Sequence, residues 1–158
     1  MARKTTWAAV GRSFEVRAKR TTGAITAAHR KTAREAVGWL RGRTLAVGIK
    51  PASPYFRGWY AKPLSLRAVK IGNTQPYANF VETGRASGKA PPVDALLGWV
   101  RRVLHLVDGR RAAFLIARSI GRRGLRPRPV WKFLHARIAA AFRAAEKRAV
   151  RAVQRSTA

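Results

Sequence analysis

The chain has very few acidic residues and no cysteine. Its 158 residues contain 6 Asp plus Glu against 34 Lys plus Arg, so the formal charge is +28. Such an imbalance repels itself unless an anion offsets it, and nucleic acid, an acidic protein surface and an anionic membrane would all serve. The absence of cysteine excludes disulfides, thiol catalysis and thiolate metal sites, and it leaves the redox compartment undetermined.

Long hydrophobic runs are also missing. No apolar run approaches the ~18 residues that a membrane-spanning helix needs, and the apolar segment after the basic N-terminus is too short for a signal peptide. A hydrophobic content of 47% is nevertheless ample for a core. We expect one soluble domain without a membrane partner, which stays where it is made or is built into a particle there.

The residue types that carry chemistry are sparse and scattered. His29, His105 and His135 form no metal-ligand spacing, and the six acids form no close pair. The segment Gly84–Ala90 lacks the terminal Gly-Lys-Ser/Thr of a phosphate loop. We therefore predict no enzyme activity and no catalytic, cofactor-binding or metal-binding residue, with no small-molecule substrate.

Positive charge is concentrated toward both ends of the chain. The net charge is +10 over residues 1–50, +4 over 51–100 and +14 over 101–158, and arginine outnumbers lysine by 25 to 9. Arginine favours planar contacts with phosphate or carboxylate. A GC-rich genome would produce the same bias without selection for contact.

Apolar residues in the first third recur at spacings of three and four, which is typical of one face of a helix. The stripe consists of Trp7, Val10, Phe14, Ala18, Thr21, Ile25, Ala28, Thr32, Ala36 and Trp39. Gly23 predicts a break in this helix, and Gly42 predicts its end. The stripe is expected to face the core, and a coiled-coil seam for a partner is the alternative.

Two segments, 45–49 and 66–71, alternate as strands do and are predicted to pair. Residues 51–63 between them hold three prolines, so we expect a long loop or a splayed hairpin. Its four aromatic residues are Tyr55, Phe56, Trp59 and Tyr60. Three uses stay open: docking on a neighbouring subunit or ring, folding back onto their own sheet, or stacking on single-stranded nucleic acid beside Arg57 and Lys62.

Two helices are predicted between Gly84 and the last part of the chain. The first starts in Pro91–Asp94, carries apolar residues on one face as far as Val107, and ends at Asp108-Gly109. The second stops near Gly124.

The last helix opens at Pro129 and keeps its apolar spacing for about 27 residues, or ~40 Å. Past Arg143 only alanine and valine remain on its apolar face. The distal end is expected to leave the domain and touch a neighbour or a polyanion, and fraying in solution is the alternative.

The segment Val69–Gly84 joins an alternating strand to an aromatic, acidic turn closed by glycine. Its marked residues are Asn73, Pro76, Tyr77, Ala78, Phe80, Val81, Glu82 and Gly84. A second segment, Arg126–Leu134, places two Arg-Pro pairs before an aromatic helix start. Together they resemble the signature of the HK97 gp10-like family, whose members are neck or tail-completion components of tailed bacteriophages. Thr83 and Val130 stand where many members carry an aromatic residue.

The resemblance implies a structural virion protein at the head–tail interface, made in the host cytoplasm and assembled as a ring. A cyclic homo-oligomer, expected to be sixfold, would contact neighbouring head-connector and tail proteins, and its charge would meet packaged DNA or acidic ring faces. The expected interface residues are Tyr55, Phe56, Trp59, Tyr60, Tyr77, Phe80 and Glu82. Glu82 is expected either to pair with an arginine or accept backbone N–H bonds at the turn, or to hold an inter-subunit contact.

The predicted fold class is α+β, with a long N-terminal helix, a small antiparallel β-sheet with a long aromatic loop, and three C-terminal helices. One domain spans 1–158. It comprises an N-terminal helical region (1–43), the sheet and loop (44–84), the helical part of the core (85–142) and a basic helical extension (143–158).

A small basic nucleic-acid-binding protein, ribosomal-like or nucleoid-like in behaviour, is the alternative function. The charge supports it, whereas no aromatic RNA-binding run, zinc-finger spacing or helix-turn-helix does. Polyanion contact is expected at Arg122, Arg123, Arg126, Arg128, Arg148, Arg151 and Arg155.

Overall fold

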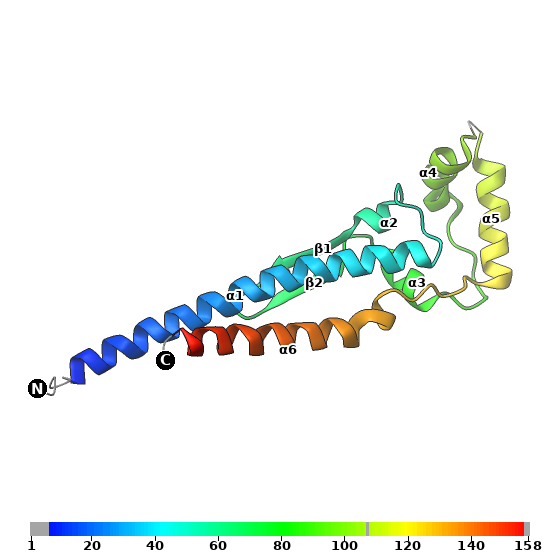
Figure 1. Ribbon diagram of the computed structural model, residues 1–158. Coiled ribbons are helices and arrows are strands. Elements are labelled where there is room, and N and C mark those ends of the chain that lie inside the picture. The colour runs from blue at the N-terminus through cyan, green and yellow to red at the C-terminus, as the bar shows by residue number, and fades with distance from the viewer. Residues whose placement is uncertain (1–6, 107, 157–158) are drawn as a thin grey trace, which may run out of the picture. The chain divides into compact units, whose positions relative to one another are not determined.

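A computed structural model describes residues 7–106 and 108–156, which form two compact units (Figure 1). Unit 1 consists of the described residues up to Gln75 together with those from Val130 onward, and unit 2 consists of those within Pro76–Pro129. The fold class is the predicted one, a mostly helical α+β protein with a long N-terminal helix, an antiparallel hairpin and C-terminal helices. The single-domain reading stays a prediction, since a unit inserted into another can still share one domain with it.

The secondary-structure elements divide between the units as follows. Unit 1 contains α1 (Trp7–Ala46), α2 (Pro54–Arg57), β1 (Trp59–Pro63), β2 (Val69–Asn73) and α6 (Trp131–Arg155). Unit 2 contains α3 (Ala78–Thr83), α4 (Val93–Leu104) and α5 (Arg110–Arg123). Among the described helices, none is both long enough and apolar enough to cross a membrane.

Helix α1 is continuous over 40 residues, about 60 Å at helical rise. The predicted break at Gly23 and the predicted end at Gly42 are therefore wrong. An isolated glycine costs a helix roughly 1 kcal/mol relative to alanine but does not terminate it. The end is set by Gly48, whose φ of 79° is left-handed.

The capping bonds at Gly48 also explain why the predicted strand 45–49 is absent. Gly48 N–H donates to the Leu45 carbonyl at 2.9 Å, and Ile49 N–H donates to the Thr44 carbonyl at 3.1 Å. This pair of bonds is the Schellman pattern that satisfies the last carbonyls of a helix. Leu45 and Ala46 accordingly complete α1, and the residues after them form its cap.

The antiparallel hairpin pairs β1 with β2, with Trp59 opposite Asn73 and Pro63 opposite Val69. The first strand thus lies inside the segment expected to be a long loop or a splayed hairpin, although its partner β2 lies outside that segment. Pro63 in β1 is compatible with this, because each strand of a two-stranded sheet has a free edge that needs no N–H donor. Pro54 lies outside the strand at the start of α2, where Ser53 caps the helix by accepting from Tyr55 N–H at 3.2 Å.

The core of unit 1 lies mainly between α1 and α6, which run side by side in opposite directions (Figure 1). Buried residues of α1 begin at Ile25; of those that follow, Thr32 and Ala36 belong to the predicted stripe, whereas His29, Ala33 and Leu40 lie beside it. They meet Leu134, Ile138 and Ala145 of α6, which are also buried. The stripe therefore faces the core only from Ile25 onward, because its part before that residue has no covering element in unit 1.

The distal part of α6 does not leave unit 1. Ala145 is buried, and His29 of α1 stacks edge-on against Phe142 at 5.4 Å, with Glu146 Oε2 4.0 Å from His29 Nε2. Ala149 and Val153 are half-buried. Small side chains suffice here because two helices can approach closely across alanine, so the expected extension is part of the α1–α6 packing.

Unit 2 has short elements and few buried side chains. Helix α4 ends at Leu104, where His105 adopts a left-handed φ of 53°, which is earlier than the predicted end at Asp108-Gly109. Val107, placed on its apolar face by the sequence, lies outside the described residues. Helix α5 ends at Arg123 and is capped by Gly124, as predicted.

Candidate functional site

The two family-like motifs meet in unit 2 through backbone hydrogen bonds. Arg85 N–H donates to the Leu125 carbonyl at 2.9 Å, and Leu125 N–H returns a bond to the Arg85 carbonyl at 2.8 Å. Arg128 N–H also donates to the Val81 carbonyl at 2.7 Å. The turn that follows α3 and the Arg-Pro segment that follows α5 are thereby joined, although some 40 residues separate them in the sequence.

Two glycines allow the backbones around Arg85 and Leu125 to come this close. Gly84 and Gly124 adopt φ values of 72° and 70°, which disfavour any residue with a Cβ. A Cβ on Gly84 would lie 2.5 Å from the Leu125 carbonyl oxygen, and one on Gly124 would meet the Arg85 carbonyl oxygen still more closely. Each glycine therefore leaves room for the chain that follows the other. The sequence indicated Gly84 as a turn residue and Gly124 only as a helix stop.

Aromatic residues of the first motif lie next to this junction on and before α3. Phe80 is 51% exposed and Tyr77 is 40% exposed, while Glu82 is half-buried. Partial burial raises the pKa of the Tyr77 phenol above its ordinary value, and the Arg102 guanidinium offsets part of that rise. Tyr77 and Phe80 thus present apolar surface beside a rigid turn, as an interface requires. The role of Glu82 stays a prediction.

The aromatic residues of the predicted loop have a different environment in unit 1. Tyr55 is 1% exposed and Trp59 is 5% exposed, and their rings meet edge-on at 5.5 Å. Trp59 Nε1–H donates to Thr44 Oγ1 at 3.0 Å, and that hydroxyl donates to the Leu40 carbonyl at 2.7 Å. Both rings are therefore buried against their own chain, and their expected role at an interface stays a prediction.

Phe56 and Tyr60 are half-buried and retain some accessible surface. The Arg41 guanidinium lies over the Phe56 ring at 5.9 Å from its centroid. Tyr60 lies opposite Gly72 in the hairpin, and a Cβ on that glycine would be 3.1 Å from the phenol oxygen. The ring thus covers the glycine, and its position is set by packing within the hairpin.

The asparagine of the first motif has a structural position in unit 1. Asn73 Nδ2–H donates to the Tyr55 carbonyl at 2.8 Å, and Asn73 Oδ1 accepts from Gln75 N–H at 3.0 Å. The side chain also crowds Gly58, where a Cβ would lie 2.5 Å from Asn73 Oδ1. It therefore ties the end of β2 to the turn after α2.

The positive charge lies almost entirely on the surface. Among the described lysines and arginines, all except Arg43 and Arg85 are exposed. The seven arginines expected to contact a polyanion form two groups. Arg122, Arg123, Arg126 and Arg128 lie at and after the end of α5 in unit 2, and Arg148, Arg151 and Arg155 lie along α6 in unit 1. The first group directly adjoins the junction of the two motifs.

Some arginines have a packing role that their spacing in the sequence does not indicate. Arg43 of α1 lies over Phe133 of α6 at 4.0 Å, and Arg137 of α6 lies over Trp39 of α1 at 4.5 Å. Each such cation–π contact contributes about 0.5–2 kcal/mol. The two contacts cross the α1–α6 interface in opposite directions. Only knowledge of the antiparallel pairing could have matched these residues.

The site offers no group of side chains suited to hold a metal ion. Within residues 7–106 and 108–156, no three His, Asp or Glu side chains gather in one place. His29 is buried, and its Nδ1 has no hydrogen-bond partner among the described residues. The described surface instead exposes aromatic and guanidinium groups near a turn that backbone hydrogen bonds hold in place.

Comparisons of the chain with protein-family models, with curated proteins and with solved structures gave no match. The resemblance to the phage neck family therefore depends on the two motifs alone.

Proposed function

We propose that this protein is a structural component of a tailed-bacteriophage virion, located at the neck, where it completes the tail end or joins it to the head. The observation that carries the proposal is the junction of the two family-like motifs. Arg128 of the second motif donates to the Val81 carbonyl of the first, and Arg85 and Leu125, which directly adjoin the two motifs, pair with each other, so the segments are joined at one place. Motifs that matched by chance would have no reason to meet.

The surface around this junction supports a role in assembly. Tyr77 and Phe80 expose aromatic surface, and Arg122, Arg123 and Arg126 are exposed at and after the end of α5, next to the Arg85–Leu125 pairing. Aromatic residues and arginine are enriched at the centres of protein interfaces. In a ring, this patch on one copy would face an unlike patch on the next, as closed cyclic assembly requires.

Deletion of the encoding gene from its phage tests the proposal most directly. Electron microscopy of lysates should then show DNA-filled heads and tails that are separate, and supplying the wild-type gene in trans should restore joined particles. Abundant intact infectious particles without the gene would contradict a neck role.

Complementation with single variants would locate the interface. We expect Phe80→Ala to restore few joined particles, because it removes the most exposed ring of the junction. Phe114→Ala is the matched control, since Phe114 on α5 is similarly exposed (53%) but lies outside both motifs. Equal complementation by the two variants would argue against the junction as the contact surface.

Nucleic-acid binding is the second candidate, and the exposure of all seven candidate arginines favours it. Direct DNA binding would weaken steeply with salt, and each lost phosphate contact would flatten the log–log slope by about one unit. The triple variant Arg122→Ala/Arg123→Ala/Arg126→Ala should then reduce the slope by about three, whereas a shallow wild-type slope would leave protein contacts as the use of the charge.

A further inference from the structure

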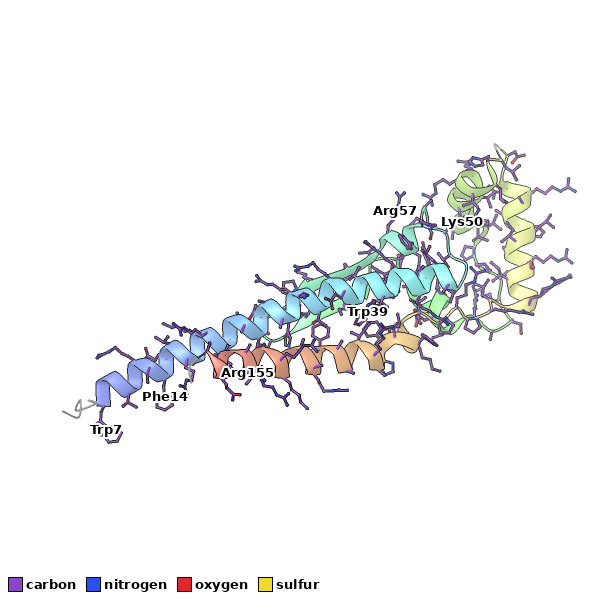
Figure 2. All side chains as sticks on the ribbon, viewed as in Figure 1. Trp7, Phe14, Trp39, Lys50, Arg57 and Arg155 are labelled. Atoms are coloured by element: carbon purple, nitrogen blue, oxygen red, sulfur yellow. The ribbon has the colours of Figure 1, made fainter. Side chains whose placement is uncertain are left out.

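The first part of α1 is a helix without a covering element in unit 1. We call residues Trp7–Arg20 the N-terminal arm. Its side chains are exposed from Gly11 through Arg20, and Figure 2 shows Trp7 and Phe14 on the part of α1 that continues past Arg155 at the end of α6. The arm is about 21 Å long at helical rise.

The arm continues the same face that is buried farther along α1. Trp7, Phe14 and Ala18 precede Ile25 by 18, 11 and 7 residues, which are whole numbers of turns within a few tens of degrees. Ile25 is buried in unit 1, whereas Trp7 is 91% exposed and Phe14 is 65% exposed. One apolar stripe is therefore covered by α6 over one part of its length and uncovered over the other.

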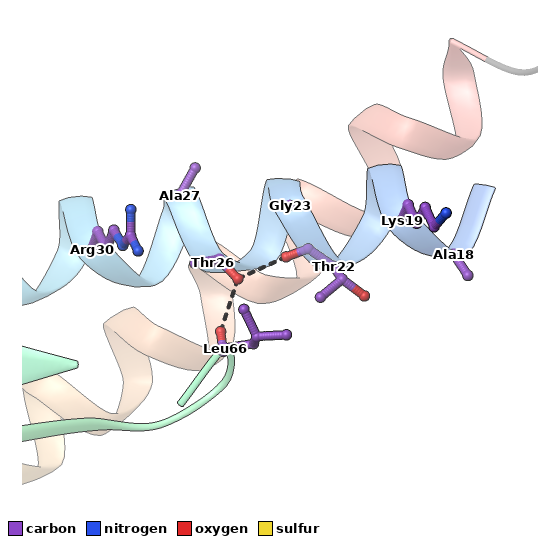
Figure 3. A pocket seen from close by; sticks show the side chains of 8 residues that line it. All are labelled: Ala18, Lys19, Thr22, Gly23, Thr26, Ala27, Arg30 and Leu66. Atoms are coloured by element: carbon purple, nitrogen blue, oxygen red, sulfur yellow. Dashed lines mark hydrogen bonds between the residues drawn. The ribbon is translucent and has the colours of Figure 1, made fainter. Parts of the chain in front are cut away.

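A groove adjoins the uncovered stripe at Ala18 and lies on the neighbouring face of α1, toward the hairpin. It has a volume of about 570 Å³ and lies between α1 and the tip of the hairpin (Figure 3). Leu66 forms its outer wall and is held there by its carbonyl, 2.9 Å from Thr26 Oγ1. The remaining lining is Ala18, Lys19, Thr22, Gly23, Thr26, Ala27 and Arg30. The groove thus has an apolar wall and two cations, and no acidic residue lines it.

Charge decides what can occupy this surface. The arm carries Arg12, Arg17, Lys19 and Arg20 against one acid, Glu15. The neighbouring end of α6, from Arg143 onward, carries five cations against Glu146. A second copy would bring the same excess of positive charge to the same place, so like charges would oppose the pairing.

The narrow width of the apolar stripe distinguishes among the three remaining candidate occupants, which are duplex DNA, a membrane surface and a partner helix. Duplex DNA would engage the cations but leave Trp7 and Phe14 in water. A membrane surface requires a broad apolar helix face, whereas here cations flank a stripe only one side chain wide at Phe14. A helix of a partner protein fits better, since α6 already covers the same stripe in this way from Ile25 onward.

We propose that the N-terminal arm and the adjoining groove bind an acidic amphipathic helix of a partner protein. The helix lies along α1 where α6 ends, its apolar face covers Trp7, Phe14 and Ala18, and its Asp and Glu residues face the flanking cations. This mode is helix-to-helix recognition through an apolar stripe with charged edges. The proposal is independent of the neck assignment, because any partner with this chemistry would satisfy it.

The test uses the full chain and a fluorescein-labelled peptide of three heptads, with leucine at the two core positions and glutamate at the flanking positions. Fluorescence anisotropy should give micromolar binding, and a polyglutamate peptide of equal length should bind at least tenfold more weakly. Hydrogen exchange should show new protection within residues 10–20. These two results separate docking on the arm from nonspecific attraction to a chain of charge +28.

A stripe variant and a control variant test whether the peptide binds to the apolar stripe. Trp7→Ala/Phe14→Ala should weaken peptide binding at least tenfold without changing the thermal unfolding midpoint, because both rings are exposed. Val16→Ala is the control, since Val16 is exposed on the opposite face of the same turn and should change binding less than twofold. Equal losses for both variants, or no peptide binding at 100 μM, would overturn the proposal.

Three further outcomes would assign the arm to an occupant other than an acidic helix. Concentration-dependent dimers in sedimentation that disappear in Trp7→Ala/Phe14→Ala would assign the arm to a second copy. Tenfold loss of binding to vesicles of phosphatidylglycerol, or to a duplex DNA, in that variant with unchanged peptide binding would assign it to a membrane or to nucleic acid. Each of these results contradicts the acidic-helix proposal.

Discussion

Units 1 and 2 are each stabilised by a different kind of contact. Unit 1 buries large side chains from both ends of the chain, including Leu40, Tyr55, Trp59 and Leu134. In the described part of unit 2, the buried hydrophobic residues are Val100, Ala113 and Ala117, and backbone hydrogen bonds at the paired glycines close the structure. We infer that unit 1 depends on side-chain volume, whereas unit 2 depends on close backbone approach at glycines, above all at Gly84 and Gly124.

The largest expected effect is on the side-chain core of unit 1. Leu40→Ala should lower the free energy of unfolding by about 2–5 kcal/mol, because Leu40 is fully buried and its truncation leaves a cavity. Urea unfolding followed by circular dichroism measures this loss. Leu45→Ala is the control on the same helix, since Leu45 is exposed and should change stability by less than about 0.5 kcal/mol. Similar losses at both positions would remove the distinction between core and surface.

The backbone closure of unit 2 should be the next most sensitive feature. Gly124→Ala should destabilise unit 2 by about 1–3 kcal/mol, because alanine disfavours the φ of 70° and its Cβ would collide with the Arg85 carbonyl. Hydrogen exchange should accelerate at Arg85 and Leu125 while the core of α1 keeps its protection.

Gly98→Ala is the matched control for that experiment. Gly98 lies within α4 and its nearest side-chain atom is 4.0 Å from the position of a Cβ, so alanine should stabilise the helix by up to about 1 kcal/mol. Destabilisation by both variants would mean that unit 2 tolerates no added methyl group anywhere, and the special role of Gly124 would be lost.

A single polar contact in unit 1 should matter less than its core volume. Thr44→Val removes the acceptor of the Trp59 indole N–H and should cost about 1–3 kcal/mol, because that donor is buried. Thr44→Ser keeps the hydroxyl and should retain most of the stability. If valine and serine gave equal stability by chemical unfolding, the hydrogen bond would contribute nothing measurable.

The smallest expected effect is a pH dependence in unit 2. Because partial burial raises the pKa of the Tyr77 phenol, the folded unit holds this proton more tightly than the unfolded chain does. Stability should therefore fall as the pH rises through and above 10, when the unfolded phenol ionises first. Tyr77→Phe should reduce that fall, as measured by thermal unfolding at pH 8 and pH 10.5, and an identical fall in both proteins would contradict the assignment.

Local patterns predicted the helices well but placed some of their ends wrongly. The spacing of apolar residues was enough to predict α1 and α6, and Gly124 correctly marked the end of α5. At the end of α1, the sequence pattern predicted Gly42 as the end and placed Gly48 in a strand, whereas the bonds to Thr44 and Leu45 make Gly48 the cap. A single glycine signals an end only where its neighbours can form the cap.

The pairing of strands and the exposure of aromatic residues were harder to predict because they depend on contacts distant in sequence. The strand β1 was hidden by Pro63 and by the two prolines that precede it, and Pro63 is tolerated because a two-stranded sheet leaves each strand a free edge. Trp7 and Trp39 belong to one stripe, yet only the second meets a residue of α6, the guanidinium of Arg137. The length of α6 relative to α1 determines this difference.

The antiparallel packing of α1 against α6 has a consequence during protein synthesis. The partner of α1 begins at Trp131, about 85 residues after α1 ends, so at 5–20 residues per second the ribosome needs roughly 4–17 s to supply it. Throughout that interval Ile25, Ala36 and Leu40 have no α6 to cover them. We therefore expect the nascent chain to need chaperones that hold apolar segments, and its yield in a heterologous host should depend on their abundance.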